Sequence, residues 1–180
     1  MENPSKMKVA LKWGGIMGAV LLIINLLFYV TGMTNMETGE NGILGTILNY
    51  VVSIGAVVMA ISEYKKLNSN YLSLGEGTVV GLLTGIVGGV IMGLYTMVFF
   101  SVIAPDLLDT IKEQAMAGAG DMDPDQEEMM GGIMNAFMSP GSMFIISVVM
   151  KFFLGLIFGF IASLFMKQEK PFNLDTDIDG

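Results

Sequence analysis

Four long apolar runs are the feature that most constrains the fold of this chain. They extend over about residues 9–33, 43–61, 74–104 and 143–166. A helix needs about 20 apolar residues to cross a hydrocarbon core roughly 30 Å thick, and each run reaches or approaches that length. Inside lipid the backbone polar groups must be satisfied within the protein, which leaves helices or closed barrels as spanning structures. The pattern predicts an all-α integral membrane four-helix bundle.

Composition supports a single membrane domain over 1–180. Of the 180 residues, 53% are hydrophobic and 14% are charged, whereas an ordinary soluble domain has about 25% charged residues. Too few charges remain to cover a soluble globule. Because four spans and their connections use the whole length, we expect no separate soluble catalytic domain.

Several chemistries are excluded by missing residue types. The chain has no Cys and no His, and its nine basic residues are all Lys. This excludes thiolate and imidazole metal sites, Ser-His and Cys-His nucleophile pairs, and arginine clamps for phosphate. The net charge of -8 argues against nucleic-acid binding. We therefore expect a non-enzymatic protein with no cofactor, no metal and no nucleic-acid partner.

The lysines predict the orientation, because positively charged loops are retained in the cytoplasm. The two ends of the chain and the connection between the second and third runs carry Lys6, Lys8, Lys12, Lys65, Lys66, Lys167 and Lys170. The long connection over 105–142 carries Lys112 against Asp106, Asp109, Glu113, Asp121, Asp123, Asp125, Glu127 and Glu128. Both termini are therefore predicted to be cytoplasmic, with 105–142 as an outer loop.

This outer loop is predicted to contain one amphipathic helix. Asp123 followed by Pro124 is a strong helix-start signal. Apolar residues then recur at helical spacing at Met130, Ile133, Met134, Phe137 and Met138. Such a helix is expected to lie on the outer membrane surface or to cap the bundle.

The third run contains a ladder of glycines, a pattern known as a glycine zipper. Its members follow one another at a spacing of four: Gly77, Gly81, Gly85, Gly89 and Gly93. Small residues at this spacing lie near one ridge of a helix, so that another backbone can approach closely. Shorter pairs occur in the first run (Gly14, Gly18) and in the fourth run (Gly155, Gly159). The ladder is predicted to pack within one bundle or, alternatively, to form the seam of a homo-oligomer.

Four polar residues are predicted to lie at one depth in the membrane. Asn25, Asn49, Tyr95 and Lys151 each lie about 9 to 14 Å from the outer end of their helix. A lysine inside a membrane is costly and indicates a functional site by default. Two interpretations stay open. Lys151 either belongs to a polar site with the other three residues, or extends along apolar surface toward the outer loop while the Asn residues join helices.

Short motifs follow one another along the chain in a characteristic order. They are Lys12-Trp13-Gly14, then Glu63-Tyr64-Lys65-Lys66 with Leu72-Ser73-Leu74-Gly75, then Pro105-Asp106, and last Met138-Ser139-Pro140-Gly141. In this order the chain resembles a bacterial membrane family known as domain of unknown function 4199. The resemblance implies the four-helix topology and transfers no function, because the family has no assigned activity.

The expected function is therefore a broad one. We expect a multi-pass protein of the bacterial inner membrane with a non-enzymatic accessory or structural role in the envelope. Its expected partners are the lipid bilayer and either a second copy or another membrane protein. The alternative is a subunit of a small-solute or ion transporter or channel with a polar site at Lys151. A water-accessible cavity that reaches Lys151 would favour this alternative.

Overall fold

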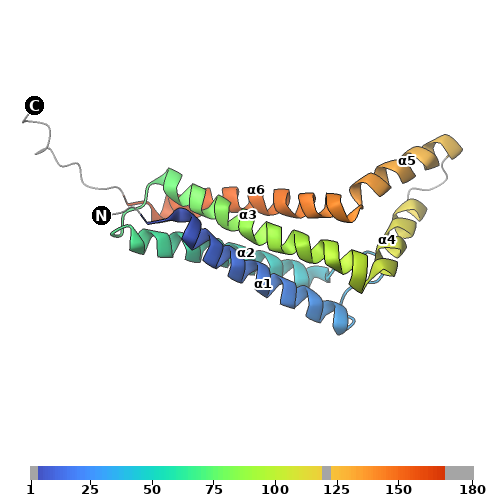
Figure 1. The fold of residues 1–180 in the computed structure, drawn as a ribbon, viewed down its shortest axis with the longest axis horizontal. Coiled ribbons are helices and arrows are strands. Elements are labelled where there is room, and N and C mark those ends of the chain that lie inside the picture. The colour runs from blue at the N-terminus through green and yellow to red at the C-terminus, as the bar shows by residue number, and fades with distance from the viewer. Residues whose placement is uncertain (1–3, 119–122, 169–180) are drawn as a thin grey trace, which may run out of the picture.

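Four long helices form the body of the protein (Figure 1). The structure is a computed structural model that describes residues 4–118 and 123–168, so Asp121 and Lys170 lie outside the described residues. The long helices are α1 (Lys6–Val30), α2 (Gly42–Leu67), α3 (Leu74–Val98) and α6 (Pro140–Met166). All four, with α3 extended to Ile103, are long and apolar enough to cross a membrane. The predicted all-α membrane bundle is confirmed.

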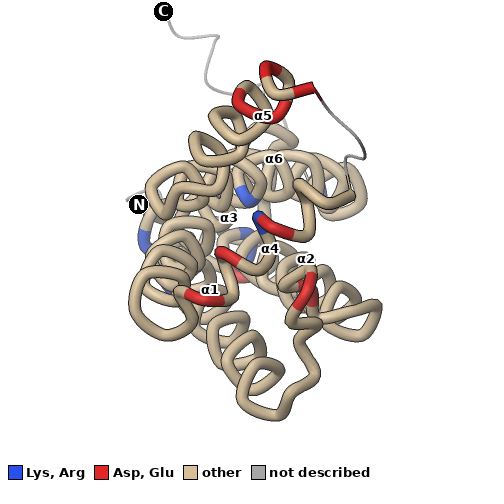
Figure 2. Tube along the Cα trace, turned by 90° about the vertical axis from the view of Figure 1, so that its right-hand side faces the viewer, with Lys and Arg blue, Asp and Glu red and all other residues tan. Residues whose placement is uncertain are grey.

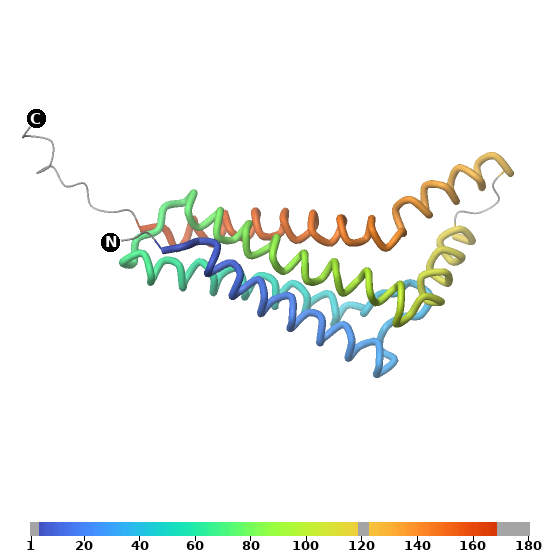
Figure 3. The backbone as a smooth tube through the Cα atoms, viewed as in Figure 1, coloured from blue at the N-terminus to red at the C-terminus, as the bar shows by residue number. Residues whose placement is uncertain are grey.

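The helices alternate in direction, so each end of the bundle has a distinct character. At one end, here called the terminal end, α1 and α3 begin and α2 and α6 end (Figures 1 and 3). Leu72 and Gln168 exchange two backbone hydrogen bonds of 2.8 and 2.9 Å there. Lys65 Nζ donates to the carbonyl oxygen of Met166 at 2.9 Å. These contacts tie α2 and α6 together at the terminal end.

Capping residues move several helix ends away from the predicted positions. Because the Ser5 side chain caps its first turn, α1 begins at Lys6 rather than near residue 9. In the same way, the Ser139 side chain caps α6, which begins at Pro140 rather than at residue 143. Helix α2 continues past its apolar run to Leu67. Hydropathy predicts the limits of the apolar surface, whereas side-chain capping determines where helices α1 and α6 begin.

The opposite end, here called the loop end, carries two further helices. Helix α3 continues as a short π-helix, η1 (Phe99–Ile103), and is followed by α4 (Pro105–Ala117) and α5 (Pro124–Phe137). Only α5 was expected from the sequence, because the acidic residues of α4 mask its apolar positions. Helix α4 buries Leu107 and Leu108 against the bundle, whereas α5 has no buried residue.

An aromatic cluster fills the interior near the loop end. The ring of Phe99 lies 4.9 Å from the ring of Tyr29 and 5.4 Å from that of Tyr95, measured between centroids. Ala104 and Leu107 are buried in the same cluster. The cluster thereby joins α1, α3 and α4.

The glycine ladder of α3 packs against α6 of the same chain. A Cβ atom built on Gly81 would lie 2.5 Å from the Cα of Gly159, and one on Gly155 would lie 2.5 Å from the carbonyl oxygen of Gly81. Built Cβ atoms on Gly77 and Gly93 would likewise meet α6 atoms. Real Cβ atoms do not come so close, so only glycine permits this backbone contact.

A second close contact lies on another side of α3. A Cβ atom built on Gly14 of α1 would lie 2.7 Å from the carbonyl oxygen of Thr84, and one on Gly18 would lie 2.6 Å from the Cβ of Ile91. Helix α3 is therefore held tightly between α1 and α6. Of the two interpretations of the ladder, the geometry corresponds to packing within one bundle.

Gly85→Ala tests the α3–α6 contact, with Gly55→Ala as its control. A Cβ atom on Gly85 would overlap the carbonyl oxygen of Lys151, whereas one on Gly55 of α2 meets nothing within 4 Å. At an open helix position the change from Gly to Ala stabilises by about 0.5–1 kcal/mol. At the tight position overpacking costs about 1–3 kcal/mol. Thermal unfolding in detergent should therefore shift down for Gly85→Ala and up for Gly55→Ala, and upward shifts in both would contradict the tight contact.

Candidate functional site

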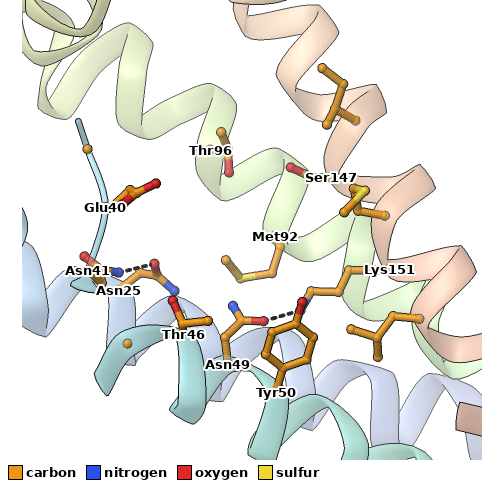
Figure 4. A pocket seen from close by; sticks show the side chains of 15 residues that line it. Asn25, Glu40, Asn41, Thr46, Asn49, Tyr50, Met92, Thr96, Ser147 and Lys151 are labelled. Atoms are coloured by element: carbon orange, nitrogen blue, oxygen red, sulfur yellow. Dashed lines mark hydrogen bonds between the residues drawn. The ribbon is translucent and has the colours of Figure 1, made fainter. Parts of the chain in front are cut away.

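The backbone of Lys151 lies in the groove of the glycine ladder. Gly85 faces the carbonyl oxygen of Lys151, and a Cβ atom built on Gly89 would lie 3.0 Å from the Lys151 Cβ. Because α6 is packed this closely against α3, the Lys151 side chain has no room along the seam. It extends across the bundle toward α2 (Figure 4).

Two side chains of α2 hold the ammonium group of Lys151. Its Nζ donates to Asn49 Oδ1 at 2.7 Å and to Ser53 Oγ at 2.8 Å. Asn49 and Ser53 are four residues apart and so lie on one face of their helix. Ser53 is fully buried and lies one turn farther from the loop end than Asn49. The ammonium group thus points into the bundle and not along its surface toward the loop end.

Asn25 belongs to a separate hydrogen-bonded chain near the mouth of the site. Its Nδ2 donates to the carbonyl oxygen of Leu21 at 2.8 Å, and its Oδ1 accepts from Asn41 Nδ2 at 2.7 Å. Asn41 Oδ1 in turn accepts from Thr34 Oγ1 at 2.7 Å. Tyr95 packs in the aromatic cluster with Phe99. Of the four residues predicted to share one level, Asn49 bonds to Lys151, Asn25 lines the same cavity with its own hydrogen-bond partners, and Tyr95 packs with aromatic rings.

Sequence reasoning missed two residues of this region. Ser53 could have been found from its spacing, because a polar residue four positions after Asn49 lies on the same helical face. Asn41 lies outside the apolar runs and returns to the bundle through a bend of the first connection. In that bend Gly39 and Gly42 have φ values of +69° and +62°, a conformation that glycine adopts readily.

A cavity of about 510 Å³ lies next to Lys151, between α2, α3 and α6 (Figure 4). Its polar lining includes Asn25, Asn41, Thr46, Asn49, Ser147 and Lys151, together with Glu40 from the connection between α1 and α2. The volume is within the range of pockets that hold small molecules, roughly 300–1,000 Å³. The cavity thus offers amide, hydroxyl and ammonium groups to a guest molecule.

Toward the terminal end the interior is filled by apolar side chains. Val57, Ile61 and Val80 are fully buried there, in a cluster that begins one turn beyond Ser53. The cavity reaches the level of Lys151 from the loop end. Among the described residues the cavity is therefore closed toward the terminal end and does not form a continuous pore.

Neutral groups alone hold the charge of Lys151 in the part of the chain that the structure describes. The ion pairs there are Lys12–Glu63 and Lys112–Asp109. An ammonium group has three N–H donors, of which Asn49 and Ser53 accept two. The described residues supply no acceptor for the third donor. An anionic or hydrogen-bond-accepting guest would suit this arrangement best.

A second polar network joins the helices at the terminal end. Glu63 Oε2 accepts from Lys12 Nζ and from Trp13 Nε1, both at 2.7 Å. The hydroxyl of Tyr64 donates to Glu76 Oε1 at 3.1 Å. The motifs quoted from the sequence for α1, α2 and α3 therefore meet in space. Their contacts are structural, since each side chain is engaged with a neighbouring helix.

Fold and site together define a class: a four-helix membrane protein with a polar cavity beside an intramembrane lysine. The chain belongs to the family described as protein of unknown function DUF4199, which matches residues 12–168. The matched range includes most of α1 and all of α2, α3 and α6. No curated protein and no solved structure matches this chain. The function is therefore argued from the site.

A double-mutant cycle tests the contact between Lys151 and Asn49. Asn49→Leu removes an acceptor and leaves a buried charge poorly satisfied, which should destabilise by about 1–3 kcal/mol. Lys151→Met removes the charge itself and should be neutral or stabilising. With Lys151→Met in place, Asn49→Leu should cost much less, and thermal unfolding of the four variants in detergent measures this coupling. Additive effects would mean that the two side chains do not interact.

Proposed function

We propose that this chain is a non-enzymatic, multi-pass protein of the bacterial inner membrane that binds a small solute at Lys151. The solute carries an anionic or hydrogen-bond-accepting group. The observation that carries the proposal is the cavity of about 510 Å³ that reaches Lys151. A charge inside a membrane is costly, and neutral acceptors alone compensate it poorly. A bound anion would supply the missing countercharge.

The cavity supports the solute-pathway alternative over a purely structural role. A bundle selected only for packing gains no stability from an open polar space, because unfilled volume lowers van der Waals contact. The packed apolar cluster at Val57, Ile61 and Val80 agrees with a binding state that is closed on one side. Transport through the bundle would require a second conformation in which this cluster opens.

We further propose that both termini are cytoplasmic, so that the cavity opens on the outer side. The lysine distribution supports this orientation. Lys6, Lys8, Lys12, Lys65 and Lys66 lie at the terminal end. Viewed from the loop end, most charged positions are acidic (Figure 2).

Thiol labelling of Ser147→Cys tests both proposals, and the chain has no native Cys that would interfere. Ser147 lines the cavity one helical turn from Lys151. Impermeant methanethiosulfonate reagents with an anionic or a cationic group should both label it in intact spheroplasts. Because the ammonium of Lys151 attracts the anionic reagent, the anionic-to-cationic rate ratio should fall several-fold in Lys151→Met.

Two single-Cys controls accompany this measurement. Val149→Cys, on an exposed apolar face of α6, should stay unlabelled because thiols facing lipid ionise poorly. Ser69→Cys, in the connection between α2 and α3, should be labelled only after permeabilisation. Labelling of Ser69→Cys in intact spheroplasts would reverse the orientation. The solute site would be refuted if Ser147→Cys did not react, or if its anionic-to-cationic rate ratio did not change in Lys151→Met.

A further inference from the structure

The lining of the cavity at Lys151 combines polar and apolar side chains. The polar part is formed largely by Asn25, Asn41, Thr46 and Asn49. The apolar part is formed by Tyr50 of α2 with Ile146, Met150 and Leu154 of α6. A small, fully hydrated ion would make no favourable contact with these apolar side chains.

The apolar part of the lining also belongs to the surface that faces lipid. Met150 is 64% exposed, Tyr50 is 49% exposed and Ile146 is 42% exposed, although all three line the cavity. In a membrane these side chains contact hydrocarbon. Tyr50 follows Asn49 in α2 and lines the cavity together with Lys151 (Figure 4). The cavity is therefore continuous with the lipid phase through the gap between α2 and α6.

The packing of the helices explains this gap. At the terminal end the contact of Lys65 with Met166 ties α2 to α6. The glycine ladder holds α6 against α3 along its length. No comparable small-residue seam joins α6 to α2 in the described part of the chain, and the two helices diverge toward the loop end (Figure 3). The side opening follows from these contacts.

The charge of the loop end disfavours access of a free anion from water. Glu40 lines the cavity, and α4 at the loop end carries Asp106, Asp109 and Glu113 against Lys112. Like charges around an entrance lower the local concentration of an anion. Access from the lipid side avoids much of this repulsion.

From these observations we infer that the ligand is an anionic amphiphile of the bilayer, an inference that rests on the proposed function. Its carboxylate or phosphate head lies at the Lys151 ammonium, and its acyl chain leaves between α2 and α6 along Tyr50 and Met150. The head supplies the countercharge that Asn49 and Ser53 cannot supply. The acyl chain of the ligand remains in hydrocarbon, so its movement from the bilayer into the gap costs little free energy.

Photolabelling of the full chain in phosphatidylcholine vesicles tests the inference. The probe is stearic acid with a diazirine in its acyl chain, and mass spectrometry locates the labelled residues. Labelling should concentrate around Tyr50 and over Ile146–Leu154. Lys151→Met should lower it about tenfold, as expected for loss of a charged hydrogen bond. Val149→Met, which places the same side chain on a neighbouring exposed position, should leave labelling unchanged.

The methyl ester of the same probe tests the role of charge without any change in the protein. The ester retains the acyl chain and the diazirine but lacks the carboxylate. Its labelling of the wild-type protein at the α2–α6 gap should therefore be as weak as the labelling of Lys151→Met by the acid. Three outcomes would each overturn the inference. They are equal labelling by acid and ester, equal labelling of wild type and Lys151→Met, and labelling spread evenly over all four long helices.

A final measurement separates this inference from the proposed function. Sodium phosphate and stearate are compared as protectants of Ser147→Cys against the anionic thiol reagent. Protection by stearate that requires Lys151 supports the amphiphile. Protection by phosphate alone, again requiring Lys151, overturns the amphiphile and leaves the solute site intact. If neither phosphate nor stearate protects, and the anionic-to-cationic rate ratio is the same in Lys151→Met, the amphiphile and the solute site are both overturned.

Discussion

The backbone contact between α3 and α6 is the constraint on which the rest of the structure depends. In lipid, apolar helices gain little from leaving their surroundings, so close packing must supply much of the association energy. Gly81, Gly85 and Gly155 permit that packing because a methyl group at any of them would overlap a facing backbone atom. Once α6 is fixed in this groove, the side chain of Lys151 can extend only across the bundle toward α2, where Asn49 and Ser53 accept its hydrogen bonds.

The two ends of the bundle perform different physical tasks. At the terminal end Glu63 receives hydrogen bonds from Lys12 and Trp13, and Lys65 reaches the end of α6, so the helices are tied together. At the loop end α2 and α6 separate (Figure 3), and residues of both helices line the cavity. The buried apolar cluster beyond Ser53 fills the interior toward the terminal end, so the proposed binding of a ligand at mid-depth would not require a continuous polar path through the bundle.

The electrostatics of the site follow from the same arrangement. A carboxylate next to Lys151 would have neutralised its charge permanently, and the chain places amide and hydroxyl oxygens there instead. Neutral acceptors orient an ammonium group while leaving its charge available to a guest. Viewed from the loop end, most charged positions are acidic (Figure 2), and Glu40 is among the residues that line the cavity. In the proposed function, a bound anion would supply the countercharge that these neutral groups do not.

The sequence by itself determined the class of fold, because hydropathy and length decide whether a segment can cross lipid and depend on no other segment. It also identified Lys151 and the glycine ladder, since an intramembrane charge and a four-residue spacing are visible in one dimension. The sequence did not predict helix α4, because its apolar residues are few and lie among acidic residues. Only the tertiary structure decided that Asn49 and Ser53 hold Lys151 while Asn25 bonds to Asn41 and Tyr95 packs with aromatic rings. Depth along each helix follows from counting residues, whereas the rotation of each helix about its axis is set by packing against its neighbours, and that rotation determines which polar groups meet.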